Sequence, residues 1–133
     1  TLLARARELG IESRVRWLGA VLPARALHLL RAADVLVVPS LLESLNKVCV
    51  EAAAVGTPFI VTSTTGVAEW VPPRGVGVVV PPRDPATLAA SIDAMLGGAW
   101  AVDDVERREF VTRFAADRVA AELRRFYAGV LGG

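Results

Sequence analysis

Apolar residues recur along the chain at two spacings that alternate from segment to segment. Positions three or four residues apart, as in Leu2, Ala6 and Leu9, predict amphipathic helices, and short unbroken apolar runs predict buried strands. The alternation of charged and apolar residues at 14–18 also predicts a strand. Gly and Pro mark the ends of these segments. The pattern predicts helices over 2–9, 23–33, 46–55, 66–71, 85–96, 103–115 and 117–131, and strands over 14–18, 35–38, 59–61 and 76–80.

This alternation of helices and strands indicates an α/β fold. The runs at 35–38, 59–61 and 76–80 carry no polar residue, which is typical of parallel strands covered by helices on both faces. We therefore expect one domain built on a parallel sheet. Ligands of such sheets bind beyond the carboxyl ends of the strands, so a site is expected in the loops at 19–21, 39–46 and 63–66.

Composition excludes several classes of function. The 133 residues carry a net charge of +1, which argues against a nucleic-acid partner held by phosphate contacts. One Cys and one His cannot form a disulfide framework or a His/Cys metal cluster, and we expect no bound metal or other cofactor. No apolar stretch is long enough to span a membrane and no leader opens the chain, so a cytoplasmic location is expected.

Two carboxylates mark the segment at 39–58 as a candidate site. Glu43 precedes the predicted helix at 46–55, and Glu51 follows eight residues later, about 80° around the helix and at most about 12 Å away. The free N–H groups and the positive dipole end of the helix lie between them. A sugar joined through phosphates to a ribose fits this layout, because carboxylates accept hydrogen bonds from hydroxyls.

The same residues have a plainer interpretation. Glu43 is then a solvated residue or an acceptor that caps the helix, and Glu51 is a solvated position on a surface helix. On spacing alone, this plainer interpretation is favoured.

Five motifs follow one another along most of the chain. They are Val15–Gly19, Ala33–Ser40, Glu43-x7-Glu51-Ala52 with Gly56-Thr57-Pro58, Thr65–Glu69, and Gly77–Val80 with Pro82-x-Asp84. In this order they resemble the retaining nucleotide-sugar glycosyltransferases of family 4, the glycosyl transferases group 1 domain. The resemblance implies that residues 1–133 are part of the Rossmann-like, C-terminal, donor-binding half of a GT-B enzyme.

The resemblance also implies roles for individual residues. Glu43 is the expected catalytic residue and contacts hydroxyls of the donor sugar, without acting as a nucleophile, and Glu51 binds the ribose of the nucleotide. The backbone at Leu45–Lys47, which includes Asn46, is expected to face the sugar and the diphosphate. The remaining expected contacts are Gly66 for the sugar and Gly19, Val21 and Ser40 for the nucleotide.

The chain departs from the family pattern in two respects. Leu45 and Asn46 stand where the family has Phe-Gly, and Asn46 is expected to cap the following helix. Two strands and a basic pair that open the family's C-terminal domain are absent, so we expect a fragment that is inactive alone and a strand at 14–18 that does not neighbour 35–38. Lys47 is expected to be solvated.

The expected reaction transfers a sugar from a nucleoside-diphosphate sugar to an acceptor hydroxyl with retention, in glycan or cell-envelope biosynthesis. Expected partners are the donor, a glycan or lipid acceptor and the missing N-terminal domain. The pairs Arg107-Arg108 and Arg124-Arg125 are candidates for contact with the inner face of a membrane or with the partner domain, although a solvated face is favoured. Two alternatives remain open. One is a non-catalytic nucleotide-sugar-binding or scaffolding domain, and the other is a GT-B epimerase or phosphorylase.

A few other residues are assigned structural roles. Cys49 is expected to be a buried small apolar residue, and His28 to lie on a helix surface or in helix packing. The three tryptophans are expected to pack against other residues: Trp17, Trp70 and Trp100.

Overall fold

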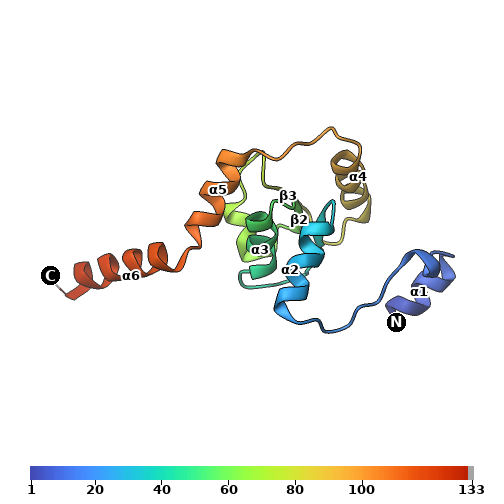
Figure 1. Cartoon of the computed structure of the whole chain (residues 1–133), viewed down its shortest axis with the longest axis horizontal. Coiled ribbons are helices and arrows are strands. Elements are labelled where there is room, and N and C mark those ends of the chain that lie inside the picture. Colours follow the sequence, from blue (N-terminus) through green and yellow to red (C-terminus); the bar gives the residue numbers. More distant parts are fainter. Residues whose placement is uncertain (132–133) are drawn as a thin grey trace.

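The computed structural model describes residues 1–131 and confirms the α/β class (Figure 1). The helices are α1 (Leu2–Glu8), α2 (Pro23–Ala32), α3 (Lys47–Val55), α4 (Pro85–Leu96), α5 (Asp104–Arg113) and α6 (Ala116–Leu131). Two short 3₁₀ helices are η1 (Glu12–Arg14) and η2 (Gly66–Trp70). The strands are β1 (Leu36–Val38), β2 (Phe59–Thr62) and β3 (Gly77–Val80).

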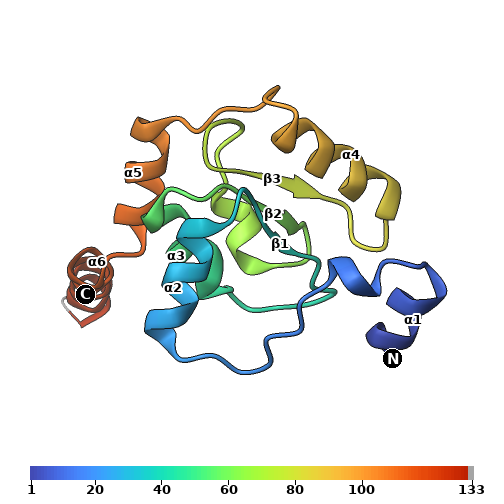
Figure 2. The same cartoon turned by 45° about the vertical axis from the view of Figure 1, so that its right-hand side comes forward.

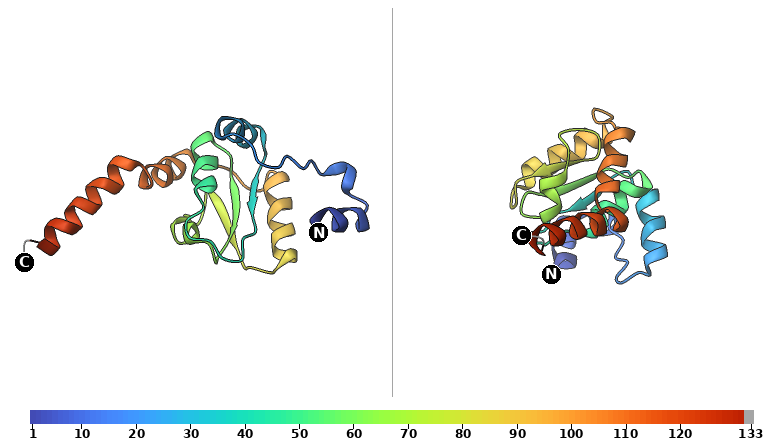
Figure 3. Two further views of the ribbon diagram at one scale, coloured as in Figure 1. Left: turned by 90° about the horizontal axis from the view of Figure 1, so that it is seen from below. Right: turned by 90° about the vertical axis from the view of Figure 1, so that its left-hand side faces the viewer.

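The three strands form one parallel sheet in the order β1-β2-β3. Leu36 pairs with Phe59, and Phe59 pairs in turn with Gly77. Figure 2 and the left view of Figure 3 show α2, α3 and α5 on one side of the sheet and α4 on the other. This arrangement explains why the three strands are nearly free of polar residues, since helices cover both faces.

The strand predicted at 14–18 is wrong. Arg14 ends η1, and residues 15–19 form no regular element and no hydrogen bond to the sheet. Trp17 and Leu18 are 52% and 43% exposed, so Trp17 also lacks the packing role expected of it. A strand exists only when another strand pairs with its N–H and C=O groups, and the sheet of residues 1–131 brings none beside this segment.

The core lies between β2 and the layer formed by α3 and α5. Phe59 and Phe110 are almost fully buried, and their ring centroids are 5.6 Å apart. Phe110 is the buried residue of α5 and also meets Phe114 edge to face at 5.2 Å. The contact between Phe59 and Phe110 therefore packs α5 against the sheet, and a 3.1 Å hydrogen bond from Arg107 Nη1 to the carbonyl oxygen of Ala53 joins α5 to α3.

The side of α3 that faces the core consists of small residues. Cys49, Ala52 and Ala53 are buried, which confirms the expectation for Cys49. Burial, and secondarily the charge of Glu43, raises the pKa of the Cys49 thiol from 9.0 to about 12. The side chain of Thr57 donates a buried 2.7 Å hydrogen bond to the carbonyl oxygen of Leu30, which joins the end of α3 to α2.

Two parts of the chain project from this body. In Figure 1, α1 with η1 lies on one side and α6 extends on the opposite side. The helix α6 has an exposed apolar stripe that includes Leu123, Phe126 and Tyr127. No helix within residues 1–131 combines the length and the apolar character needed to cross a membrane.

Replacing Phe110 with Ala is expected to lower the free energy of unfolding by about 3–5 kcal/mol, because it leaves a cavity beside Phe59. Urea unfolding measures the change. The matched control is Phe126→Ala, at a ring that is 64% exposed, for which we expect a change within about 0.5 kcal/mol. Equal effects of the two variants would contradict the assignment of Phe110 as the anchor of α5.

The folded chain is expected to protect Cys49 from thiol reagents at pH 8, whereas the denatured chain reacts at once. Because folding raises this pKa, the thiol's contribution to stability is fully present below pH 9 and is lost as the pH rises toward 12. The difference in unfolding free energy between the chain and Cys49→Ala should therefore shrink over that range. A difference that stays constant would show that the thiol titrates normally in the fold.

Candidate functional site

The loops that follow β1 and β2 join at the carboxyl edge of the sheet. The N–H of Gly66 donates to the carbonyl oxygen of Glu43 at 3.0 Å, and the N–H of Glu43 donates to that of Thr64 at 3.4 Å. Glu43 and Thr65 thereby form an isolated parallel bridge beyond the ends of the strands. Two of the three loops in which a site was expected are thus held side by side.

The contact between these loops requires glycine at position 66. A Cβ atom on Gly66 would lie 1.7 Å from the carbonyl oxygen of Ser44 and 2.9 Å from its carbonyl carbon. Both atoms belong to the backbone, so no side-chain rotation relieves the overlap. Gly66 therefore sets the approach of its loop to the loop that carries Glu43.

A cluster of threonine hydroxyl groups joins the end of β2 to the loop that follows β1. Thr62 and Thr65 are almost fully buried, and their Oγ1 atoms are 3.3 Å apart. The hydroxyls of Thr62 and Thr64 both donate to the carbonyl oxygen of Ser40. Sequence reasoning missed this cluster, and the available signal was a run of four hydroxyl residues, 62–65, directly after a buried strand.

The carboxylate of Glu43 is held by its own loop. Its Oε2 atom accepts hydrogen bonds from Ser40 Oγ at 3.0 Å and from Asn46 Nδ2 at 2.7 Å. The Oε1 atom accepts none from any residue within 1–131, and the side chain is exposed. One carboxylate oxygen therefore orients the group, and the other is available to a ligand.

Asn46 adopts a left-handed conformation with φ of 63° and ψ of 79°. Asn tolerates this region better than most residues, and it stands where the related motif has Gly. The expectation that Asn46 caps α3 is half right, since it occupies the N-cap position but its side chain makes no capping hydrogen bond. Its amide group instead contacts Glu43 and, weakly, the thiol of Cys49 at 3.8 Å.

The first turn of α3 therefore has no side-chain cap. Lys47 opens the helix with an exposed side chain that makes no ion pair with another residue of 1–131. Leu45, just before the helix, is half-buried and contributes to the core on this side. The start of α3, which directly follows the loop of Glu43, is consequently free of a side-chain cap and is suited to an anionic group.

The other predicted site residues are not drawn into this cluster. Glu51 is exposed on α3, and no hydrogen bond joins it to Glu43 within the part of the chain that the structure describes. Gly19, with φ of 60°, and Val21 lie in the extended segment before α2, which makes no hydrogen bond to the loops after β1 and β2. Their roles stay predictions.

The same edge of the sheet carries a shallow pocket on its α4 side. It has a volume of about 200 Å³ and is lined at the ends of all three strands, by Pro39, Thr62 and Val80. Arg83 borders it in a left-handed conformation with φ of 59°. No group of three or more His, Cys, Asp and Glu side chains in residues 1–131 is placed to hold a metal ion.

Comparisons with known proteins agree on one family. The sequence profile of the family described as "Glycosyl transferases group 1" matches residues 1–97. The chain is 38% identical over 96 residues to the D-inositol 3-phosphate glycosyltransferase of Nocardia farcinica, covering 72% of this chain and 21% of that protein. It is 33% identical over 122 residues to the glycogen synthase of Mycobacterium tuberculosis, covering 92% of this chain and 28% of that protein.

Solved structures give the same result. The sucrose-phosphate synthase of Thermosynechococcus elongatus superposes with a TM-score of 0.84 at 30% identity, over 98% of this chain and 34% of that one. The apo form of a lipopolysaccharide outer core galactosyltransferase has the same fold, with a TM-score of 0.79 at 20% identity over 98% and 36%. Both are GT-B glycosyltransferases, and the present sheet corresponds to a Rossmann-like part of that fold.

The chain spans 21% and 28% of the length of these two curated relatives. Its family match nevertheless covers most of its own residues, from the first helix to the end of α4. On these grounds the chain belongs to the glycosyl transferases group 1 family of glycosyltransferases.

Proposed function

We propose that residues 1–133 supply the donor-binding half of an enzyme that moves a sugar from a nucleoside diphosphate to an acceptor hydroxyl with retention. The observation that carries this proposal is the joined pair of loops at Glu43 and Gly66, which presents a carboxylate oxygen beside the uncapped start of α3. The relatives named D-inositol 3-phosphate glycosyltransferase and glycogen synthase support the transfer of a sugar as the reaction.

In the proposed complex, the diphosphate lies at the start of α3. As the bond between the sugar carbon and the phosphate oxygen breaks, negative charge grows on the departing diphosphate. The N–H groups at Leu45–Lys47 and the helix dipole stabilise that charge without reorganisation. The acceptor oxygen attacks from the face that the diphosphate leaves, and its proton passes to a departing phosphate oxygen.

Glu43 orients the donor sugar in this proposal. Ser40 and Asn46 fix its carboxylate through Oε2, so Oε1 accepts a hydrogen bond from a sugar hydroxyl. Gly66 permits the close approach of the second loop to the same sugar. Glu51, exposed further along α3, accepts hydrogen bonds from the ribose, and Gly19, Val21 and Ser40 border the nucleotide. We propose no resident metal or other cofactor.

A second candidate is a domain that binds nucleotide sugars without transferring them. It is favoured by Asn46, whose Cβ stands where Gly would let the diphosphate approach the backbone. Transfer of sugar to any acceptor by the protein that carries this chain would exclude this candidate. Release of nucleotide that depends on the acceptor would also argue against an epimerase or a phosphorylase.

Glu51→Gln is expected to weaken nucleoside-diphosphate binding by about 1.5–3 kcal/mol, or roughly 10- to 150-fold in Kd, because one charge-assisted hydrogen bond is lost. Titration calorimetry on the full-length protein measures this. The control is Glu109→Gln, at another exposed helical glutamate, on α5. An unchanged Kd for Glu51→Gln would remove Glu51 from the ribose site.

Glu43→Gln is expected to reduce kcat by about 10²-fold and to change nucleotide affinity far less, because Glu43 is assigned to the sugar and not to the nucleotide. The amide oxygen can still accept from Ser40 and Asn46, so the loop should keep its shape. Initial rates of sugar transfer measure the effect. Transfer at the rate of the unmodified enzyme would refute a catalytic role for Glu43.

A further inference from the structure

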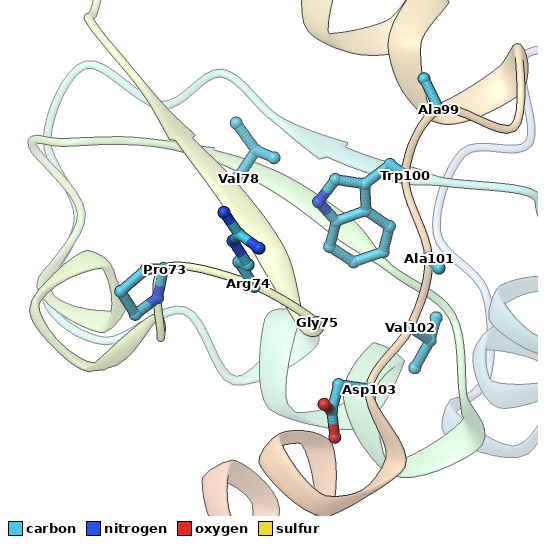
Figure 4. A pocket seen from close by; sticks show the side chains of 9 residues that line it. All are labelled: Pro73, Arg74, Gly75, Val78, Ala99, Trp100, Ala101, Val102 and Asp103. Atoms are coloured by element: carbon cyan, nitrogen blue, oxygen red, sulfur yellow. The ribbon is translucent and has the colours of Figure 1, made fainter.

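A second pocket lies away from the candidate site, at the amino end of β3. It is bounded by the loop before β3 and by the linker between α4 and α5 (Figure 4). Its volume of about 600 Å³ falls within the range of roughly 300–1,000 Å³ that is common for small-molecule sites. The lining residues are Pro73, Arg74, Gly75, Val78, Ala99, Trp100, Ala101, Val102 and Asp103.

The two walls of this pocket are fastened together. The N–H of Asp103 donates to the carbonyl oxygen of Gly75 at 2.9 Å. Gly75 has φ of 88°, and a Cβ atom on it would lie 2.3 Å from the Cβ of Asp103. The loop and the linker therefore meet at a fixed distance, so the hollow between them is a defined feature of the fold.

The pocket combines an aromatic wall with two polar groups of opposite charge. In Figure 4 the indole of Trp100 and the side chain of Arg74 lie on facing walls of the hollow, with Val78 on β3 next to Arg74 and the carboxylate of Asp103 at the end nearest α5. The Oδ1 atom of Asp103 accepts from the N–H groups of Val105 and Glu106, at 2.8 and 3.1 Å. Its Oδ2 atom accepts no hydrogen bond within residues 1–131, and Arg74 forms no ion pair there.

These charges restrict the ligand. Arg74 and Asp103 carry opposite charges at two ends of the lining, so a ligand with one net charge is attracted to one of them and repelled by the other. A neutral molecule with several hydroxyls avoids this conflict, because each hydroxyl can accept from Arg74 or donate to Asp103. One apolar face on the same molecule would cover the indole and Val78.

A pyranose has this combination of properties, with a ring of hydroxyls and a face of C–H groups. We propose that the pocket between Trp100 and Arg74 is a saccharide-binding site separate from the donor site. It lies at the amino end of β3, whereas Glu43 and Gly66 follow the carboxyl ends of β1 and β2. It therefore binds sugar without a nucleotide, and it holds a glycan chain beside the domain rather than at the reacting carbon.

Nuclear magnetic resonance of the indole N–H groups tests this proposal. In the ¹⁵N-labelled full-length protein, the indole signal of Trp100 is identified by its loss in Trp100→Ala, and that of Trp17 by its loss in Trp17→Ala. Titration with maltotriose, trehalose and sucrose, each without nucleotide, should shift and saturate the Trp100 signal at millimolar concentration for at least one of them. The signal of Trp17, which is 52% exposed, serves as the internal control and should stay unchanged.

Variants locate the binding. Arg74→Gln removes the charge from one wall and should raise the Kd by about tenfold or more, as should Trp100→Ala. Trp17→Ala is the matched control and should bind normally. Arg74 is exposed, so its variant keeps the test valid if Trp100→Ala fails to fold. Glu51→Gln should leave this binding intact, so a failure of the donor-site proposal is distinguishable from a failure here.

Three results would overturn the proposal. The first is a Trp100 signal that none of the three sugars moves. The second is saccharide binding that Arg74→Gln and Trp100→Ala leave unchanged, which places the sugar elsewhere. The third is that the free amino acid glycine, a zwitterion, binds as tightly as the best sugar. That result would show that the opposite charges of Arg74 and Asp103 select a zwitterion instead.

Discussion

The strand β2 is the element on which the rest of the structure depends. All four of its residues, Phe59–Thr62, are buried, and it pairs with β1 on one edge and with β3 on the other. Phe59 begins the strand and carries the aromatic contact that attaches α5. Thr62 ends it and begins the hydroxyl cluster under the loops of the candidate site. The aromatic contact of the core and the hydroxyl cluster of the site therefore lie at opposite ends of one buried strand.

This arrangement explains how an exposed carboxylate is held in a defined position. Glu43 lies on a loop at the surface, but its backbone is hydrogen-bonded to Gly66, and the carbonyl oxygen of Ser40 accepts from the buried Thr62 and the half-buried Thr64. Each of these partners is the last residue of β2 or lies in the segment that follows it directly. The order at the site thus derives from burial of the strand, and the carboxylate itself stays accessible to water and ligand.

The sequence pattern predicted the elements whose signal is local and missed the features that depend on distant partners. The apolar runs at 35–38, 59–61 and 76–80 all form strands, because their composition already requires cover on both faces. The alternation at 14–18 meets the separate local criterion for a strand with one covered face but lacks a neighbouring strand. The inward hydroxyls of Thr62 and Thr65 were missed because their polarity is compatible with burial only through contacts that folding creates. Asn46 occupies the predicted N-cap position, yet its amide contacts Glu43, and no rule of local sequence ranks these two partners.

The contact between Gly66 and Ser44 has a consequence for substitution within the two loops. The loops meet backbone against backbone, so their separation is set by atoms that have no rotamers. Side chains elsewhere on either loop can then be exchanged without altering that separation. The chemistry presented to a ligand and the geometry of the loops are therefore determined by different atoms of the same residues.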